Sequence, residues 1–318
     1  MALSRNLTGI LLAITCTVIF SINDVSIKFL SGGYALHQVI LIRALIGMTF
    51  LIGFIAVTGI GFGQLRSRRP GAQLLRVIIV MVSNVTFFLG LAAMPIADAS
   101  AVAYVSPLAI TFLSVLVLGE SVGWRRWAAV VVGMVGVIIM LRPGAGVIQP
   151  AALLVLFSAV LYATGNLITR AIGNTESAVS LSFFVQAGFV VVSTAMGLWV
   201  GDGHRATDDA LMGFLFRPWI WPPVADWPIF LATGLSVCIG GLMIAQAYRT
   251  CEAGLVAPFE YVGMPMAILW GVAVFGTWPD RVAWIGIALI CGAGLYTLWR
   301  ETARRKETVG PLGIETGQ

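Results

Sequence analysis

Charged residues lie deep inside long apolar segments, where a charge needs a partner or a polar cavity. Asp24 and Arg43 occupy neighbouring segments, each about 10 Å from the same end at 1.5 Å per residue. Antiparallel neighbours would bring these side chains level, which predicts a buried ion pair, with Lys28 one helical turn away as a competitor. Such a pair can be structural, form an outer gate or contact a substrate. Lys28 can also extend to the membrane interface.

Glu260 is an acid about 10 Å inside another apolar segment, at 1.5 Å per residue. A buried carboxylate without a permanent cation can bind and release a coupling proton, so Glu260 is the candidate for proton coupling. The alternative is a fixed ion pair with Arg170 or Arg249, which lie at the ends of neighbouring segments. Both interpretations stay open.

Aromatic and amide side chains recur in the same segments, where they offer ring faces and neutral hydrogen bonds. Polar side chains avoid lipid, so we expect this group to line one cavity, with ordinary interhelical hydrogen bonding as the alternative for each member. Pro107 and Pro265 predict kinks beside two of the tyrosines. The predicted substrate-binding residues are Asn84, Tyr104, Tyr162, Asn166, Gln186, Gln246, Tyr248, Glu260, Tyr261 and Trp270.

The elements that position these residues must be membrane helices. The 318-residue chain is 59% hydrophobic and only 10% charged, against about 25% charged in a soluble domain. Long continuous apolar runs exclude an outer-membrane barrel, whose segments alternate, and predict an all-α integral membrane protein. Ten transmembrane helices are expected at 7–30, 36–58, 74–94, 98–118, 124–142, 151–172, 177–200, 228–249, 254–276 and 281–299.

The basic residues predict the orientation of these helices. The net charge of +5 comes from residues clustered between apolar runs, which indicates topology rather than a nucleic acid partner. With the N-terminus inside, 13 of the 19 basic residues fall in inner loops and tails: Arg5, Arg66, Arg68, Arg69, Arg76, Arg125, Arg126, Arg170, Arg249, Arg300, Arg304, Arg305 and Lys306. We therefore expect a multi-pass inner-membrane protein with both termini in the cytoplasm.

An internal repeat divides the chain. At an offset of 142, Phe20, Asp24 and Lys28 align with Tyr162, Asn166 and Arg170; at an offset of 157, Tyr104, Val105, Gly119 and Trp127 align with Tyr261, Val262, Gly276 and Trp284. We expect one repeat over 1–145, a second over 146–300 and a cytoplasmic tail over 301–318. Five spans is an odd number, so the second repeat must be inverted relative to the first. Inverted repeats around a central cavity indicate a secondary transporter with alternating access, and a duplicated scaffold without transport is the alternative.

A further pattern of residues recurs through both halves: Tyr104, Ser106, Pro107, Leu118, Gly119, Glu120, Trp127, Gly133, Gly136, Arg142, Pro143, Ala247, Tyr248, Arg249, Ala257, Pro258, Tyr261, Trp284, Gly286, Gly292 and Gly294. With this pattern the sequence resembles the EamA branch of the drug/metabolite transporter superfamily over residues 7–300. The resemblance implies a ten-helix transporter of small metabolites, built from two inverted five-helix repeats. The second half departs from the pattern, because Gly276-Thr277 stands where the first half has Gly119-Glu120, and this weakens any symmetric role for Glu120. Small residues in the fifth and tenth spans, including Gly136 and Gly286, suit close packing of these spans within one chain or across a dimer.

Other function classes lack their signals in this sequence. We expect no enzyme, since the chain has no phosphate loop or nucleophile elbow and only His37 and His204; no metal or cofactor is expected either. A channel-like facilitator and a membrane-embedded enzyme are the alternatives to a transporter. One buried cation, Arg43, disfavours polyanions, so a small neutral, zwitterionic or cationic metabolite is predicted as the substrate. The resemblance implies amino-acid-like, flavin or S-adenosylmethionine-like molecules, carried by a monomer or homodimer.

Overall fold

Helices account for all the regular structure of the described chain. The computed structural model describes residues 5–118, 124–141, 150–207 and 209–308, and no strand occurs among them. Seven helical segments are long and apolar enough to cross a membrane: Leu7–Leu30, Leu36–Thr58, Pro70–Ala93, Ile96–Val117, Pro150–Ile172, Ala178–Val200 and Val224–Thr250. Three shorter apolar segments cover Trp127–Gly136, Phe259–Phe275 and Arg281–Ala293. The chain is therefore a multi-pass membrane protein, and the ten-span count stays a prediction.

The first half of the chain contains five long or paired helical elements. They are α1 (Arg5–Leu30), α2 (Leu36–Thr58), α3 (Pro70–Ala93), the pair α4 (Ile96–Ala103) and α5 (Ser106–Leu118), and α6 (Trp124–Leu141), with the short helix η1 (Phe62–Leu65) after α2. The second half contains α7 (Pro150–Ile172), α8 (Ala178–Val200), α9 (Ala210–Phe216), η2 (Val224–Asp226), α10 (Trp227–Thr250), α11 (Ala253–Val256), η3 (Ala257–Val262), α12 (Gly263–Phe275) and α13 (Arg281–Thr308).

Two segments are interrupted in the middle, where the sequence predicts kinks at Pro107 and Pro265. The first breaks at Tyr104 and Val105, between α4 and α5, and the second passes through η3 before α12. Each proline lies in the first turn of the helix after the break, where its missing N–H has no helical acceptor to lose. The prolines therefore accompany breaks between helices rather than bends within one helix.

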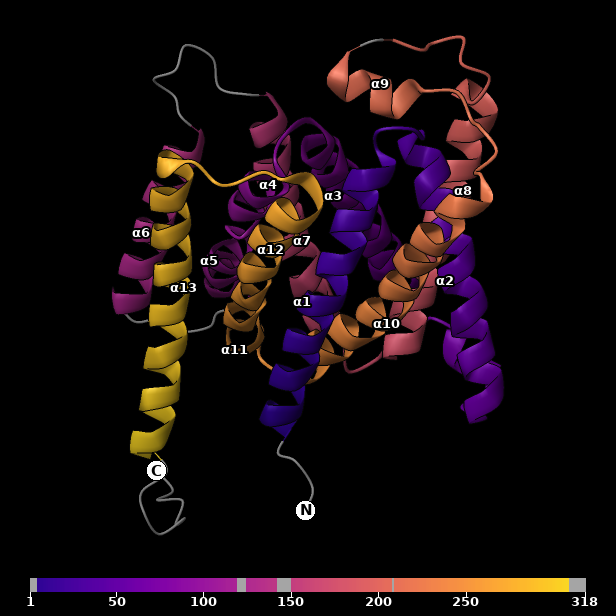
Figure 1. Ribbon diagram of the computed structural model, residues 1–318. Helices are drawn as coiled ribbons and strands as arrows, with labels where there is room; N and C mark the ends of the chain where they lie inside the picture. The colour runs from indigo at the N-terminus through magenta and orange to yellow at the C-terminus, as the bar shows by residue number, and fades with distance from the viewer. Residues whose placement is uncertain (1–4, 119–123, 142–149, 208, 309–318) are drawn as a thin grey trace.

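The long helices pair across the two halves of the chain. In Figure 1, the start of α1 and the end of α13 lie at one end of the bundle and α9 lies at the other. α1 packs along α10, α3 along α7, and α2 along α8, while α6 and α13 pack against each other. Gly136 permits this last contact, since a Cβ there would lie 3.0 Å from the carbonyl oxygen of Gly286. The small-residue packing predicted for these two spans thus occurs within one chain.

Some predicted features differ from the structure or fall beyond it. α13 continues to Thr308, so helix extends through the first part of the predicted tail. A terminal helix can run on past the membrane because its Arg- and Glu-rich end still forms helical hydrogen bonds in water. Glu120, Arg142, the repeat boundary at 145 and residues 309–318 lie outside the described residues.

Glu176 joins two loops at the end of the bundle where α1 begins. Its carboxylate accepts hydrogen bonds from Ser67 Oγ at 2.9 Å, from the backbone N–H groups of Arg68 and Arg69 at 2.8 and 2.9 Å, and from Ser180 Oγ at 3.2 Å. These donors outweigh the desolvation that acts in the opposite direction and hold the pKa of Glu176 below its usual range. The carboxylate also lies at the N-terminus of α3, where the helix dipole favours a negative charge.

We predict that Glu176→Gln lowers the free energy of unfolding by about 1–3 kcal/mol at pH 7, because one charged acceptor serves several donors. A depressed folded-state pKa gives stability that is complete above the unfolded pKa and is lost as pH falls through the folded value. The difference between wild type and variant should therefore shrink as pH falls below the ordinary glutamate pKa of 4.5. Thermal unfolding in detergent across pH tests this, and a difference independent of pH would rule out the carboxylate as its source.

Candidate functional site

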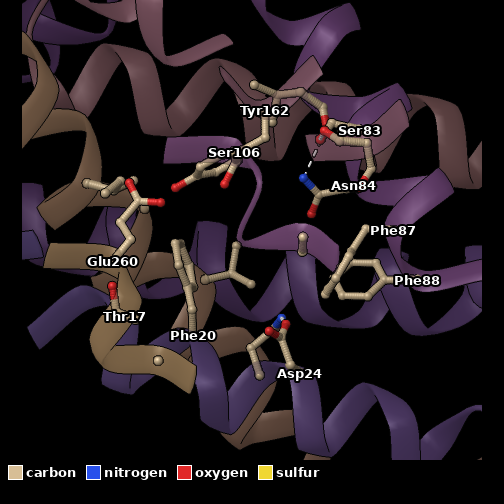
Figure 2. A pocket seen from close by; sticks show the side chains of 18 of the residues that line it. Thr17, Phe20, Asp24, Ser83, Asn84, Phe87, Phe88, Ser106, Tyr162 and Glu260 are labelled. Carbon is tan, nitrogen blue, oxygen red and sulfur yellow. Dashed lines mark hydrogen bonds between the residues drawn. The ribbon is translucent and has the colours of Figure 1, made fainter. Parts of the chain in front are cut away.

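A cavity of about 240 Å³ lies between the two halves of the chain. Side chains from α1, α2, α3, α4, α5, α7, α8, α10, η3 and α12 line it, so residues from both halves share one space. Figure 2 shows Glu260 and Thr17 on one side, Phe87 and Phe88 on the other, and Asp24 and Asn84 between them. The predicted residues that line the cavity are Asp24, Arg43, Asn84, Tyr104, Tyr162, Asn166, Gln186, Glu260 and Trp270.

Four other predicted residues lie outside the lining. Gln246 accepts a hydrogen bond from Arg249 Nη1 at 3.0 Å near the end of α10. Tyr261 lies beside Tyr104, with ring centroids 5.9 Å apart and ring planes tilted by 37°. Tyr248 is fully buried behind the cavity and contacts Glu260. Lys28 Nζ donates to the carbonyl oxygens at the end of α3. Periodicity alone cannot separate these residues from the lining, because helix rotation decides which face each side chain occupies.

Asp24 and Arg43 approach the same region of the cavity but do not form the predicted ion pair. Instead, Asn23 lies between them: Arg43 Nη1 donates to Asn23 Oδ1 at 3.2 Å, and Asn23 Nδ2 donates to Asp24 Oδ1 at 3.1 Å. No nitrogen–oxygen distance of 4.0 Å or less joins the two charges in the part of the chain described. Asp24 and Arg43 lie at the same depth, as predicted. The prediction did not consider Asn23, the amide next to Asp24, which lies where the direct contact between the two charges was expected.

Arg43 is held in place mainly by uncharged groups. Its guanidinium lies 4.9 Å from the ring centroid of Phe88 and 5.1 Å from that of Phe189, and Nη2 donates to Asn84 Oδ1 at 3.2 Å. The side chain is only 1% exposed. Ring faces stabilise a cation without neutralising it, so Arg43 keeps a positive charge beside the cavity.

Glu260 also lacks the basic partners considered for it. Arg170 and Arg249 donate to backbone carbonyls near the end of α10 instead. Tyr248 Oη donates to Glu260 Oε1 at 2.5 Å, and Figure 2 shows the Tyr162 hydroxyl pointing toward the same carboxylate. A carboxylate solvated by phenol groups can exist with or without its proton, because no fixed cation commits it to the charged form.

Arg76 also lines the cavity, although the distribution of basic residues predicts it in an inner loop. The structure places it inside α3, 7% exposed, where Nε donates to Thr169 Oγ1 at 2.5 Å and Nη1 to the carbonyl of Leu181 at 3.0 Å. The available signal was Pro70, which is suited to the first turn of a helix and places the start of α3 four residues before the predicted 74. With Arg76, the cavity carries two formal positive and two formal negative charges, the latter from Asp24 and Glu260.

The cavity's lining is suited to binding a small molecule. Its lining combines aromatic rings, amides, hydroxyls and balanced charges. No group of three or more potential metal ligands of the kinds His, Cys, Asp and Glu occurs among the described residues. Such a lining can hold a small polar or aromatic molecule through stacking and hydrogen bonds.

Known proteins resemble the chain at the level of family, full-length sequence and fold. Residues 7–142 match the EamA-like transporter family. A riboflavin transporter of Rhizobium johnstonii is 28% identical over 304 residues, covering 96% of this chain and 95% of the relative. An S-adenosylmethionine uptake transporter of Rickettsia prowazekii is 24% identical over 300 residues, covering 94% and 95%. A pseudopaline exporter of Pseudomonas aeruginosa is 24% identical, covering 89% and 93%.

A protein of known crystal structure has the same fold. It aligns with a TM-score of 0.69 at 20% identity, and the alignment covers 92% of this chain and 97% of that one. At this identity the likeness describes the arrangement of helices and leaves the bound molecule open.

We predict that Asn23 and Arg43 are energetically coupled. Asn23→Ala and Arg43→Met should each destabilise the protein, while the double variant should cost about 1 kcal/mol less than their sum, because the two changes remove one shared hydrogen bond. Thermal unfolding of the four proteins measures the coupling. The control is the pair Asn23→Ala and Ser83→Ala. Ser83 donates to the carbonyl of Ser158 and not to Asn23, so the stability losses of these two single variants should add up in the double variant. Additive losses for Asn23 and Arg43 would contradict the bridge.

Proposed function

From the membership of residues 7–142 in the EamA-like transporter family, we propose that this chain is a secondary transporter working by alternating access. The observation that carries the proposal is the polar cavity enclosed jointly by the two halves of a membrane protein. The cargo is a small neutral, zwitterionic or cationic metabolite, since the four lining charges sum to zero. Relatives named for riboflavin and S-adenosylmethionine support this range.

The spacing of helices supports two five-span repeats, at 1–145 and 146–300. Adding 142 to the bounds of α2, 36–58, gives 178–200, which are the bounds of α8. Adding 157 to the bounds of α3, 70–93, gives 227–250, which are the bounds of α10. The same offset carries 106–118 of α5 onto 263–275 of α12. Repeated helix bounds at the offsets of the sequence repeat are unlikely to arise from unrelated halves.

Contacts between loops support the inversion of the second repeat. The α1–α2 turn contacts the segment after α9, because Arg217 Nη1 donates to the carbonyls of Ser31 and Tyr34 at 2.9 and 3.2 Å. The equivalent α7–α8 turn contacts the α2–α3 loop through Glu176. α2, about 35 Å long at 1.5 Å per residue, separates these two places. Equivalent turns at opposite ends of the bundle favour repeats that cross the membrane in opposite senses.

Lys28 and Arg170, which are equivalent in the repeat, each donate hydrogen bonds to backbone carbonyls at the end of a helix: Lys28 at α3 and Arg170 at α10. Lys28 Nζ donates to the carbonyls of Leu91, Ala92 and Met94 at 2.7, 3.0 and 2.8 Å. Its repeat equivalent, Arg170, donates from Nη1 to the carbonyl of Arg249 at 3.4 Å. We assign Lys28 to the outer gate on this basis: Lys28 makes three short charge-assisted bonds that tie α1 to α3 at the α9 end, whereas Arg170 makes one bond of 3.4 Å to α10.

Glu260 is our candidate for proton coupling. It lines the cavity, is 5% exposed and accepts a hydrogen bond from the neutral hydroxyl of Tyr248. A proton arriving there would remove the single charge on that wall and favour one of the two access forms over the other, which couples movement of the proton to movement of the cargo. The proposed setting is the inner membrane with both termini in the cytoplasm, as the basic residues predict.

Uptake by purified protein in lipid vesicles tests the function. We expect saturable uptake of at least one of riboflavin, S-adenosylmethionine or phenylalanine, accelerated by an imposed pH gradient. Vesicles that take up none of these above the protein-free level, or that conduct them linearly with concentration, would contradict the proposal.

In the same vesicles, we predict that Glu260→Gln abolishes acceleration by the pH gradient and leaves substrate affinity within about threefold, well below 1.4 kcal/mol. The physical reason is that glutamine keeps an acceptor for Tyr248 but cannot exchange a proton. Glu252→Gln, an exposed acid before α11, is the matched control and should keep the gradient dependence. Gradient dependence that survives in Glu260→Gln would remove the coupling role.

We also predict that Lys28→Met loosens the outer gate. In a cysteine-free background carrying Ser106→Cys within the cavity, an impermeant thiol reagent added at the α9 side should react several-fold faster when Lys28 is Met. Three lost bonds to carbonyls favour the open form. Lys28→Arg retains a charged donor and should restore slow labelling. An unchanged rate in Lys28→Met would show that this contact does not hold the gate.

A further inference from the structure

Arg76 carries a positive charge that no acidic side chain of the described chain neutralises. Its hydrogen bonds go to neutral acceptors, the hydroxyl of Thr169 and the carbonyl of Leu181. Within the described ranges, no nitrogen–oxygen distance of 4.0 Å or less joins its guanidinium to a carboxylate. A buried cation without a counterion is costly, so Arg76 favours an anionic group beside it.

The other three charges of the lining are answered within the protein. Arg43 and Asp24 have opposite signs and share the amide of Asn23. Glu260 accepts a hydrogen bond from Tyr248 and, as an acid, can become neutral by taking up a proton. A guanidinium stays charged in proteins. The charge of Arg76 is therefore permanent, and it is left for a molecule in the cavity to balance.

One edge of the Arg76 guanidinium is accessible from the cavity. The bonds described above occupy Nε and Nη1. Nη2 makes no hydrogen bond within the described chain and, in contrast to Arg43 Nε, is not enclosed by protein. Val80 and Ser83 lie one and two turns further along α3 and line the cavity together with Arg76, as Figure 2 shows for Ser83. This face of α3 therefore presents Nη2 to a bound molecule.

A second hydrogen-bond donor lies beside this edge. Ser182 directly follows Leu181, whose carbonyl accepts from Arg76 Nη1, and it also lines the cavity. Its hydroxyl points toward α10, since a Cβ on Gly241, another lining residue, would lie 2.9 Å from Ser182 Oγ. The hydroxyl makes no hydrogen bond within the described chain and is not enclosed by protein. It can therefore donate to the same ligand as Arg76.

The charge and the donors of this site select a carboxylate. Its two oxygens can accept from a guanidinium N–H and from a hydroxyl, and its single negative charge balances a single guanidinium. A phosphate ester brings nearly two negative charges at pH 7 and would leave one of them unbalanced. A neutral carbonyl accepts the hydrogen bonds but leaves the charge of Arg76 without a counterion.

We propose that Arg76 and Ser182 form a carboxylate-binding site in the cavity, so that the cargo carries one carboxylate group. The inference rests on the proposed transport function and assigns the residues that bind this group. Thr169 and the carbonyl of Leu181 position the guanidinium, because they occupy Nε and Nη1 and leave Nη2 turned to the cavity.

Matched acids and amides test the site. Thermal unfolding of the purified protein in detergent is followed at increasing concentrations of phenylalanine or phenylalaninamide, and of benzoate or benzamide. For the wild type, at least one acid should stabilise the protein with an apparent Kd at least about tenfold below that of its amide, because the amide lacks the negative charge. Arg76→Met should bind acid and amide equally.

Two further variants separate binding from folding. Arg76→Lys keeps the charge without the Nη2 edge, and its preference for the acid should fall by at least about threefold. Arg69→Met is the matched control, because Arg69 is an exposed arginine at the start of the same helix, outside the cavity lining. It should keep the full preference of the wild type.

Equal affinities of the wild type for acid and amide, or no stabilisation by either acid, would overturn the proposal. A preference that survives Arg76→Met would do the same, as would an unreduced preference in Arg76→Lys should the Met variant fail to fold. The vesicle uptake assay decides separately on transport: uptake of riboflavin without binding of either acid would refute the carboxylate site and leave the transport function intact.

Discussion

Inside a bilayer no water is available to hydrogen-bond to a peptide group or to a charge. Each such group must therefore find a partner within the chain or face a polar cavity. This constraint explains why the polar side chains of separate helices gather in one place. Asn23 solvates both Asp24 and Arg43, and Tyr248 solvates Glu260. The apolar exterior follows from the same rule: Val57 and Leu198, 88% and 86% exposed, face lipid at no cost.

The broken segments meet the constraint in another way. The helices are interrupted at Tyr104 and before Gly263, and both interruptions occur next to the cavity. Irregular backbone at membrane depth is tolerated where it is buried in protein or lines a polar space. The proposed alternating access requires helices to tilt relative to one another, and these interruptions are the points where regular α-helix stops within each segment.

The sequence predicts most of the spans and much of the cavity, and it fails where contacts depend on helix rotation. Long apolar runs located α2 and α8 almost to the residue, because hydropathy and turn residues mark helix ends. The depths of Asp24 and Arg43 were also predictable from a rise of 1.5 Å per residue. The bridging Asn23 was not, since an amide next to a carboxylate gives no periodic signal. Arg76 was misplaced because a basic residue near a helix end resembles a topology marker, and only its bonds to Thr169 and Leu181 show that it points inward.

Inverted repeats require that repeat-equivalent turns lie on opposite sides of one membrane. Gly32 and Asn174, exposed and 142 residues apart, occupy such turns after α1 and α7. Each can be replaced singly by cysteine in a cysteine-free background and exposed to an impermeant thiol reagent in intact cells. The cysteine at position 32 should react with reagent added outside the cells, and the cysteine at 174 should react only after the membrane is permeabilised. Labelling of both positions from the same side would contradict it.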